Sequence, residues 1–198
     1  MKSIKLGSKL INQKSNPYFI AEIGVNHEGS MKLAKKMIIQ AKSAGLNAVK
    51  FQTYKAENLV IKKSPAYWDT KKEKTKSQFS LFKKFDKFNK SNYLNLHKYC
   101  KKNKIDFLTT PFDVESILWL KNIMPAIKIA SADINNFPLL RQIGSTKKKV
   151  FLEESDFSRK TFARVAQLFS TKKTRVRRKR FALENVFFCA LNENVSRV

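Results

Sequence analysis

The stretch YFIAEIGVNHEGSMKLAKKMIIQAKSAGLNAVKF, residues 18–51, decides the fold because it holds a strand, a helix and a second strand in succession. The apolar run Tyr18–Ile23 is typical of a buried strand, and Ser30–Ala44 carries its apolar residues at helical spacing. Gly45 ends this helix, and Asn47–Phe51 is the next apolar run. Strands joined through a helix pair in parallel, so the stretch predicts a βαβ unit.

The same alternation continues along the chain and predicts an α/β fold with a parallel sheet. Short apolar runs indicate further strands at Ile105–Thr109, Ala126–Ala130 and Val150–Leu152. Helical periodicity recurs at Asn92–Lys102, Val114–Asn122 and Pro138–Gly144. The polar and aromatic stretch Thr53–Phe88 interrupts the pattern, and we expect a long loop there with a helix near Gln78–Lys87.

The pattern changes near residue 150. A helix is expected at Ser158–Phe169, a basic run with almost no apolar content follows at Thr171–Arg180, and Phe181–Leu191 is apolar enough for one more strand. A closed (β/α)8 TIM barrel needs about 250 residues, so we expect only its first four to five β/α units. We therefore divide the chain into a barrel-like part, residues 1–150, and a divergent or out-of-frame basic tail, residues 151–198.

The charge balance is strongly basic, with 41 lysines and arginines against 15 acidic residues and a formal net charge of +26. Such a charge suggests nucleic acid, a membrane surface or an anionic substrate. Most lysines are scattered singly, which fits solvated surfaces, and Lys172–Arg180 is the exception. A nucleic-acid-binding protein is the alternative that Arg175–Arg180 supports, but no recognition motif accompanies this run and we do not expect nucleic acid as the partner.

The cysteines and the apolar runs bear on the compartment. Cys100 and Cys189 lie at neither metal-ligand nor redox-motif spacing, so free thiols in a reducing cytosol are the simplest account. Met1–Pro17 holds no apolar run long enough for a secretory signal, and no later stretch is long enough to span a bilayer. We therefore expect a soluble, cytoplasmic protein with no membrane partner.

Polar side chains fall at or near the C-terminal ends of the predicted strands. Glu22 interrupts the first strand and Lys50 closes the second, while Thr110 follows the third. Lys128 lies within the fourth, three residues before Ser131. In parallel α/β folds ligands bind at this edge, because the loops that leave the strand ends converge there. Two lysines, a threonine and a serine at this edge predict an anion site, with phosphate the obvious ligand.

Glu22 is the hardest of these residues to explain as part of an ordinary core. Burying its carboxylate within the apolar run Tyr18–Ile23 is costly unless it has a partner or a task. A lone lysine at a strand end is more often solvated or salt-bridged than catalytic. Lys50 and Lys128 indicate a binding site only because polar residues occur at several strand ends at once. His27 by itself is typical of a loop histidine rather than a ligand.

Five segments follow one another between Pro17 and Gly144: FIAEIGVNHEGSMKLAKKMI, AGLNAVKFQTYKAENLV, SPAYWD, IDFLTTPFD and IKIASADINNFPLL. In order and spacing they resemble the phosphoenolpyruvate-dependent sialic acid (N-acetylneuraminate) synthases. Five consecutive segments are a more specific signal than one short motif. The resemblance implies a (β/α)8 barrel, usually followed by a small antifreeze-like domain that reaches across the site of a partner subunit in a homodimer.

The resemblance also assigns roles to the polar residues. The positions that hold the phosphate and carboxylate of phosphoenolpyruvate are matched by Lys50, Thr110, Lys128 and Ser131. Glu22 matches a catalytic position facing the sugar, where it would orient hydroxyls or move a proton. The remaining sugar-side positions are Gln52, His27 and Asp133, the last standing where many members have glutamate.

The reaction implied by the resemblance is the synthesis of a nonulosonic acid. C3 of phosphoenolpyruvate joins the aldehyde carbon of an open-chain N-acylmannosamine or a related sugar, water adds at C2, and phosphate leaves. A divalent metal ion, manganese or magnesium, polarises the aldehyde oxygen as a Lewis acid. Neuraminic, legionaminic and pseudaminic acid synthases share these motifs, so the motifs leave the particular sugar open.

The chain departs from the family pattern after Lys149, where a strand running into a Ser-Thr-Gly turn is expected and VFLEESDFSRK stands instead. The family's metal-binding histidines come from later strands, and the nearest echo here is Phe188–Leu191. His27 and His97 are the only histidines, so no metal ligands are expected in this chain. We therefore expect a truncated synthase, which is either active with strands from another chain or an inactive fragment that keeps the phosphate-binding half.

Overall fold

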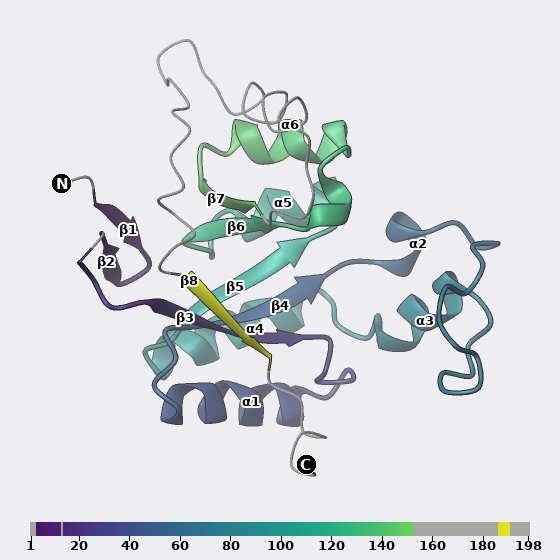
Figure 1. The fold of residues 1–198 in the computed structure, drawn as a ribbon, viewed down its shortest axis with the longest axis horizontal. Helices are drawn as coiled ribbons and strands as arrows, with labels where there is room; N and C mark the ends of the chain where they lie inside the picture. The colour runs from purple at the N-terminus through teal and green to yellow at the C-terminus, as the bar shows by residue number, and fades with distance from the viewer. Residues whose placement is uncertain (1–2, 13, 153–185, 191–198) are drawn as a thin grey trace.

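A computed structural model describes residues 3–12, 14–152 and 186–190, and it shows an α/β fold with parallel strands (Figure 1). The strands are β1 (Ile4–Leu6), β2 (Lys9–Ile11), β3 (Tyr18–Gly24), β4 (Ala48–Thr53), β5 (Asp106–Pro111), β6 (Ala126–Ile129), β7 (Lys149–Leu152) and β8 (Val186–Ala190). The helices are α1 (Met31–Ser43), α2 (Ala56–Leu59), α3 (Gln78–Phe85), α4 (Lys90–Lys102), α5 (Val114–Leu120) and α6 (Phe137–Ser145), with a 3₁₀ turn at Ser131–Asp133.

The strands follow the predicted order. The sheet β5-β4-β3-β8 is parallel throughout, and β6 pairs in parallel with β7. β6 also lies beside β5, so the two groups continue one another (Figure 1). The βαβ unit predicted from residues 18–51 is confirmed. Its helix α1 begins after Ser30, whose side chain accepts a hydrogen bond from the backbone N–H of Leu33.

The two faces of the strands carry different cores. One face packs against α1, α4, α5 and α6, with a core that includes Ile23, Met37, Phe51, Leu96 and Ile127. The opposite face carries a smaller cluster of Leu6, Tyr18, Ile20, Ala48, Leu108, Ala126 and Phe151. Side chains alternate between the two faces of a strand. In each strand, the residue two positions after a member of this cluster therefore lies on the same face and nearer to the C-terminal end.

The hairpin of β1 and β2 was not predicted from the sequence. Its two strands pair antiparallel through the turn at Gly7, which has a φ of +54°. Leu6 is buried in the smaller cluster, beside the N-terminal ends of the parallel strands. There the hydroxyl of Tyr18 donates a hydrogen bond of 2.6 Å to the carboxylate of Asp106. The hairpin therefore lies at the N-terminal ends of the parallel strands, whereas the anion site is predicted at their C-terminal ends.

Two predictions beyond residue 150 can be compared with the structure. β7 confirms the strand expected at Val150–Leu152, and β8 falls within the strand expected at Phe181–Leu191. β8 lies alongside β3, with Phe188 opposite Ile20 and Ala190 opposite Glu22. The helix expected at Ser158–Phe169 and the basic run Thr171–Arg180 lie outside the described residues. Within the described ranges, no helix is long and apolar enough to cross a membrane.

Candidate functional site

The centre of the site is formed by three residues on adjacent strands. Glu22 of β3 lies opposite Lys50 of β4 in the parallel register. The Lys50 ammonium is 2.6 Å from the Glu22 carboxylate and donates a hydrogen bond of 3.3 Å to the Thr110 hydroxyl of β5. The Lys50 side chain is 5% exposed and that of Glu22 is 25% exposed. A carboxylate within this apolar run was expected to need a partner or a task, and Lys50 is its partner.

Lys128 brings a second cation to the same face. It follows Ala126 of the smaller cluster by two residues in β6, so its side chain leaves the strand on the side where Lys50 lies. Lys128 is 4% exposed, and an ammonium buried to this extent needs anionic or hydrogen-bonding partners. Two buried ammonium groups and a hydroxyl at the C-terminal ends of parallel strands form a surface suited to a phosphate or carboxylate.

Gln52 lies near these residues. It follows Lys50 by two positions in β4, and its amide lies over Gly24, where an added Cβ would be 3.9 Å from the Gln52 nitrogen. The register of β3 shifts between Glu22 and Gly24, and Gly24 has a φ of +57°. This bulge turns the loop after β3 away from the strand direction while Glu22 stays in register.

His27 has surroundings different from those of Glu22. Its ring is 1% exposed and stacks on Phe88 with centroids 4.1 Å apart and planes 4° apart, and it also contacts Phe51 of the helix-facing core. Its Nδ1 accepts a hydrogen bond from the backbone N–H of Gly29, and its Nε2 is buried without a hydrogen-bond partner among the described residues. Burial lowers the pKa of His27 to about 4, so the ring is neutral at pH 7. The ring thereby supports the loop after β3, and the sugar-side role that the resemblance assigns to His27 stays a prediction.

Ser131 and Asp133 lie in the 3₁₀ turn that follows β6. Both are partly exposed, and one Asp133 oxygen accepts a hydrogen bond of 3.2 Å from the Asn136 side chain. Its other oxygen is buried and has no partner among the described residues. Burial raises the pKa of Asp133. The turn places both side chains at the C-terminal end of β6, at the same edge as Lys128.

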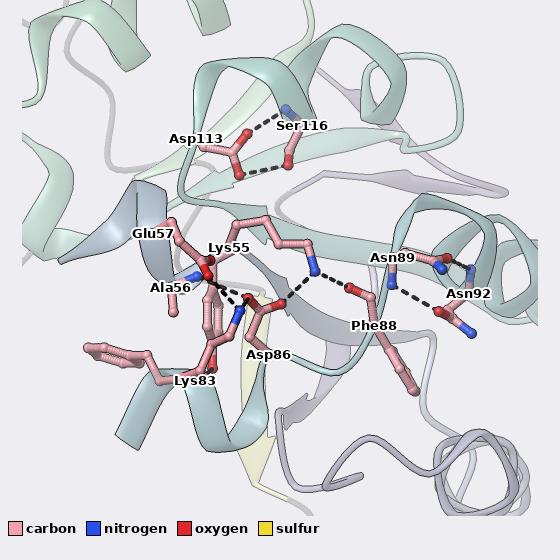
Figure 2. A network of polar contacts seen from close by, with 12 residues as sticks. Lys55, Ala56, Glu57, Lys83, Asp86, Phe88, Asn89, Asn92, Asp113 and Ser116 are labelled. Atoms are coloured by element: carbon pink, nitrogen blue, oxygen red, sulfur yellow. Dashed lines mark hydrogen bonds and ion pairs between the residues drawn. The ribbon is translucent and has the colours of Figure 1, made fainter. Parts of the chain in front are cut away.

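A network of polar contacts that was not predicted joins the segment before α4 to the residues that follow β4 (Figure 2). The buried carboxylate of Asp86 accepts hydrogen bonds from the Lys55 ammonium, at 2.7 Å, and from the backbone N–H of Ala56, at 3.1 Å. Lys55 also donates to the carbonyl of Phe88, and Lys83 joins Asp86 to Glu57. No sequence signal distinguishes Asp86, because its partners Lys55 and Lys83 are two among many lysines.

A metal ion would need a different set of ligands. Across residues 3–12, 14–152 and 186–190, no three His, Cys, Asp or Glu side chains come close enough together to hold one. His27 faces aromatic rings, and Glu22 is engaged by Lys50. The described residues therefore do not fit the divalent metal that the resemblance implies.

The model of the NeuB family matches residues 37–176 of this chain. The N,N'-diacetyllegionaminic acid synthase of Campylobacter jejuni is 39% identical over 137 residues, which are 67% of this chain and 40% of that protein. The N-acetylneuraminate-9-phosphate synthase of Drosophila melanogaster is 34% identical over 154 residues, 76% of this chain and 41% of that protein. The chain thus spans about two fifths of the length of these curated relatives.

A solved structure shows the same similarity. The N-acetylneuraminic acid (sialic acid) synthetase of Leptospira borgpetersenii, in complex with citrate, superposes with a TM-score of 0.72 and 28% sequence identity. The superposition covers 99% of this chain and 63% of that one. The family match, the curated relatives and this structure therefore agree with the resemblance found in the sequence.

Proposed function

The chain belongs to the NeuB family, and we propose that it forms part of a (β/α)8 barrel that binds phosphoenolpyruvate for nonulosonic acid synthesis. The observation that carries this proposal is the pair of buried ammonium groups, Lys50 and Lys128, on one face of the strands beside Thr110. Strands β3 to β7 would be the first five of the barrel. The domain boundary near residue 150 remains part of this proposal.

The binding roles follow from charge and position. Lys50 and Lys128 would neutralise the phosphate and carboxylate of phosphoenolpyruvate, with hydroxyl donors from Thr110 and Ser131. Fixed cations in a site with little water hold a polyanion more strongly than they would on an open surface. This half of the reaction needs only residues that the structure describes.

The sugar half rests on Glu22, Gln52 and Asp133, with His27 in the loop after β3. The acceptor would be an N-acylated mannosamine-type aldehyde, whose carbon forms the new bond with C3 of phosphoenolpyruvate while its oxygen takes up a proton. Water then adds at C2 and phosphate leaves. Glu22, which is partly exposed at the end of β3, would orient a hydroxyl or move that proton. A divalent metal and a homodimer belong to the complete reaction, and we propose that the cytoplasm is its compartment.

Binding and turnover test this function separately. Calorimetric titration of the purified chain with phosphoenolpyruvate should show one site, weakened at least tenfold by Lys128→Ala, because a buried charge contact to the ligand is lost. Lys98→Ala removes an exposed lysine of α4 and serves as the matched control. Phosphate release with phosphoenolpyruvate, manganese and N-acetylmannosamine then reports turnover. Absence of binding, or equal weakening by both variants, would refute the proposed site.

A further inference from the structure

Lys50 is engaged before any anion arrives. Its ammonium is in contact with the Glu22 carboxylate at 2.6 Å and with the Thr110 hydroxyl at 3.3 Å. An incoming phosphate or carboxylate would compete with Glu22 for the charge and the N–H donors of this one ammonium. The site therefore already contains an anion in contact with the cation that a ligand's anion would use.

The two partners of this ion pair differ in how easily they can move. The Lys50 side chain is 5% exposed and fixed within β4, whereas the Glu22 side chain is 25% exposed at the point where β3 ends in a bulge. If Glu22 turns toward water, hydration compensates its carboxylate for the lost ion pair. Lys50 has no such route, because moving it would break the contacts of a buried charge. Glu22 is therefore the partner that an anion would displace.

We propose that Glu22 is a built-in competitor for Lys50 and thereby sets the affinity of the site for phosphate-bearing anions. The proposal rests on the proposed function, since it needs an anion at Lys50. Without ligand, the carboxylate neutralises the charge of a buried lysine. With ligand, the anion replaces the carboxylate, and part of its binding free energy is spent on breaking the ion pair.

Removing the charge of Glu22 tests this directly. Titrating the full chain with inorganic phosphate and with phosphoenolpyruvate should show Glu22→Gln binding both roughly tenfold more tightly than the original chain, because the competing charge is gone. Glu22→Asp keeps the charge but withdraws it by one methylene, and it should give a smaller gain. Because Glu22→Asp keeps both charges of the ion pair, it still tests the proposal if Glu22→Gln does not fold.

Glu73→Gln is the matched control. Glu73 pairs with Lys84 at 2.9 Å, its side chain is 29% exposed, and its substitution changes the net charge by the same amount. Equal gains in Glu22→Gln and Glu73→Gln would reduce the effect to net charge and overturn the proposal. Binding by the original chain without a gain in Glu22→Gln would overturn it and leave the proposed function standing. If no variant binds either anion, both proposals fail.

Discussion

The ring of Phe88 lies flat on the ring of His27, with centroids 4.1 Å apart and planes 4° apart. This stack joins the loop that leaves β3 to the chain that returns from the α2 and α3 region. Phe88 is fixed from two sides, since its carbonyl accepts from Lys55 and its ring meets Tyr93 edge-on. Tyr93 in turn donates to the carbonyl of Gln52 in β4. The loops beside Glu22 and Lys50 are therefore held in place by this stack and by the hydrogen bonds of Phe88 and Tyr93.

Replacing His27 by phenylalanine should remove part of the pH dependence of stability. The folded-state pKa of His27 is about 4, against an ordinary 6.5, because the ring is buried between Phe51 and Phe88. As the pH falls, His27 is therefore protonated in the unfolded chain before it is protonated in the folded one. The contribution of the neutral ring to the free energy of unfolding is complete above about pH 6.5 and is lost as the pH falls toward 4. We expect a loss of about 1 kcal/mol in the free energy of unfolding between about pH 7.5 and about pH 5.5.

Urea denaturation at the two pH values measures this loss. His27→Phe should flatten it, whereas His97→Gln should change it less, because His97 is only partly buried in α4. An unchanged pH dependence in His27→Phe would show that this ring does not titrate as its surroundings indicate.

Asp86→Asn should loosen the chain between β4 and α4. The substitution keeps the shape of the side chain but removes the charge that binds Lys55 at 2.7 Å. We expect a loss of about 2 kcal/mol in urea denaturation and faster cleavage by trypsin at the lysines of residues 71–76. Glu57→Gln is the control, because its ion pair with Lys83 is half exposed on both sides and should contribute much less to stability. Equal effects of the two variants would contradict the role of Asp86.

The parallel strands could be predicted because each combines a short apolar run with a polar residue at its end. Glu22 was the most informative single residue, since a carboxylate inside an apolar run demands a partner, and Lys50 lies directly opposite it. The period of two along each strand then places Lys128 on the same face. These inferences need only local sequence and the rule that strands joined through a helix pair in parallel.

The remaining features depend on contacts between distant segments. β1 and β2 have three residues each, too few for a periodic pattern, and their position depends on burying Leu6 against β3 and β5. The position of His27 depends on the bulge after Glu22. The alternation of side chains along a strand predicts neither this bulge nor the course of the loop that follows it. Phe88, its stacking partner, lies 61 positions further along the sequence and carries no motif.

Tyr18→Phe should destabilise the fold without disturbing its packing. The Tyr18 hydroxyl donates to the Asp106 carboxylate at 2.6 Å, and burial together with this carboxylate raises the pKa of Tyr18 well above its ordinary value. Removing the hydroxyl leaves Asp106 without this donor, and we expect a loss of about 1 to 2 kcal/mol in the free energy of unfolding. Tyr67→Phe, at a side chain exposed by 74%, should have almost no effect. Equal losses in both variants would assign no role to the buried hydrogen bond.

Gly7→Ala should be more costly than Gly45→Ala, although both glycines have positive φ, +54° and +78°. At Gly45 an added Cβ meets no atom within 4 Å, so its cost is the backbone conformation, about 1 kcal/mol. At Gly7 the Cβ would overlap the Asp106 carboxylate, which cannot move aside without losing the hydroxyl of Tyr18. We expect about 3 kcal/mol for Gly7→Ala from urea denaturation.

A double-mutant cycle separates the two contributions at Gly7. In a Tyr18→Phe background the Asp106 carboxylate has already lost this hydrogen bond and is freer to turn away from the new methyl group. Gly7→Ala should then cost about 1 kcal/mol less than in the original chain, because only strain and repacking remain. Strict additivity of the two substitutions would mean that Asp106 does not couple the N-terminal hairpin to β3, and the packing of Leu6 and Ile11 against the smaller cluster would then hold the hairpin.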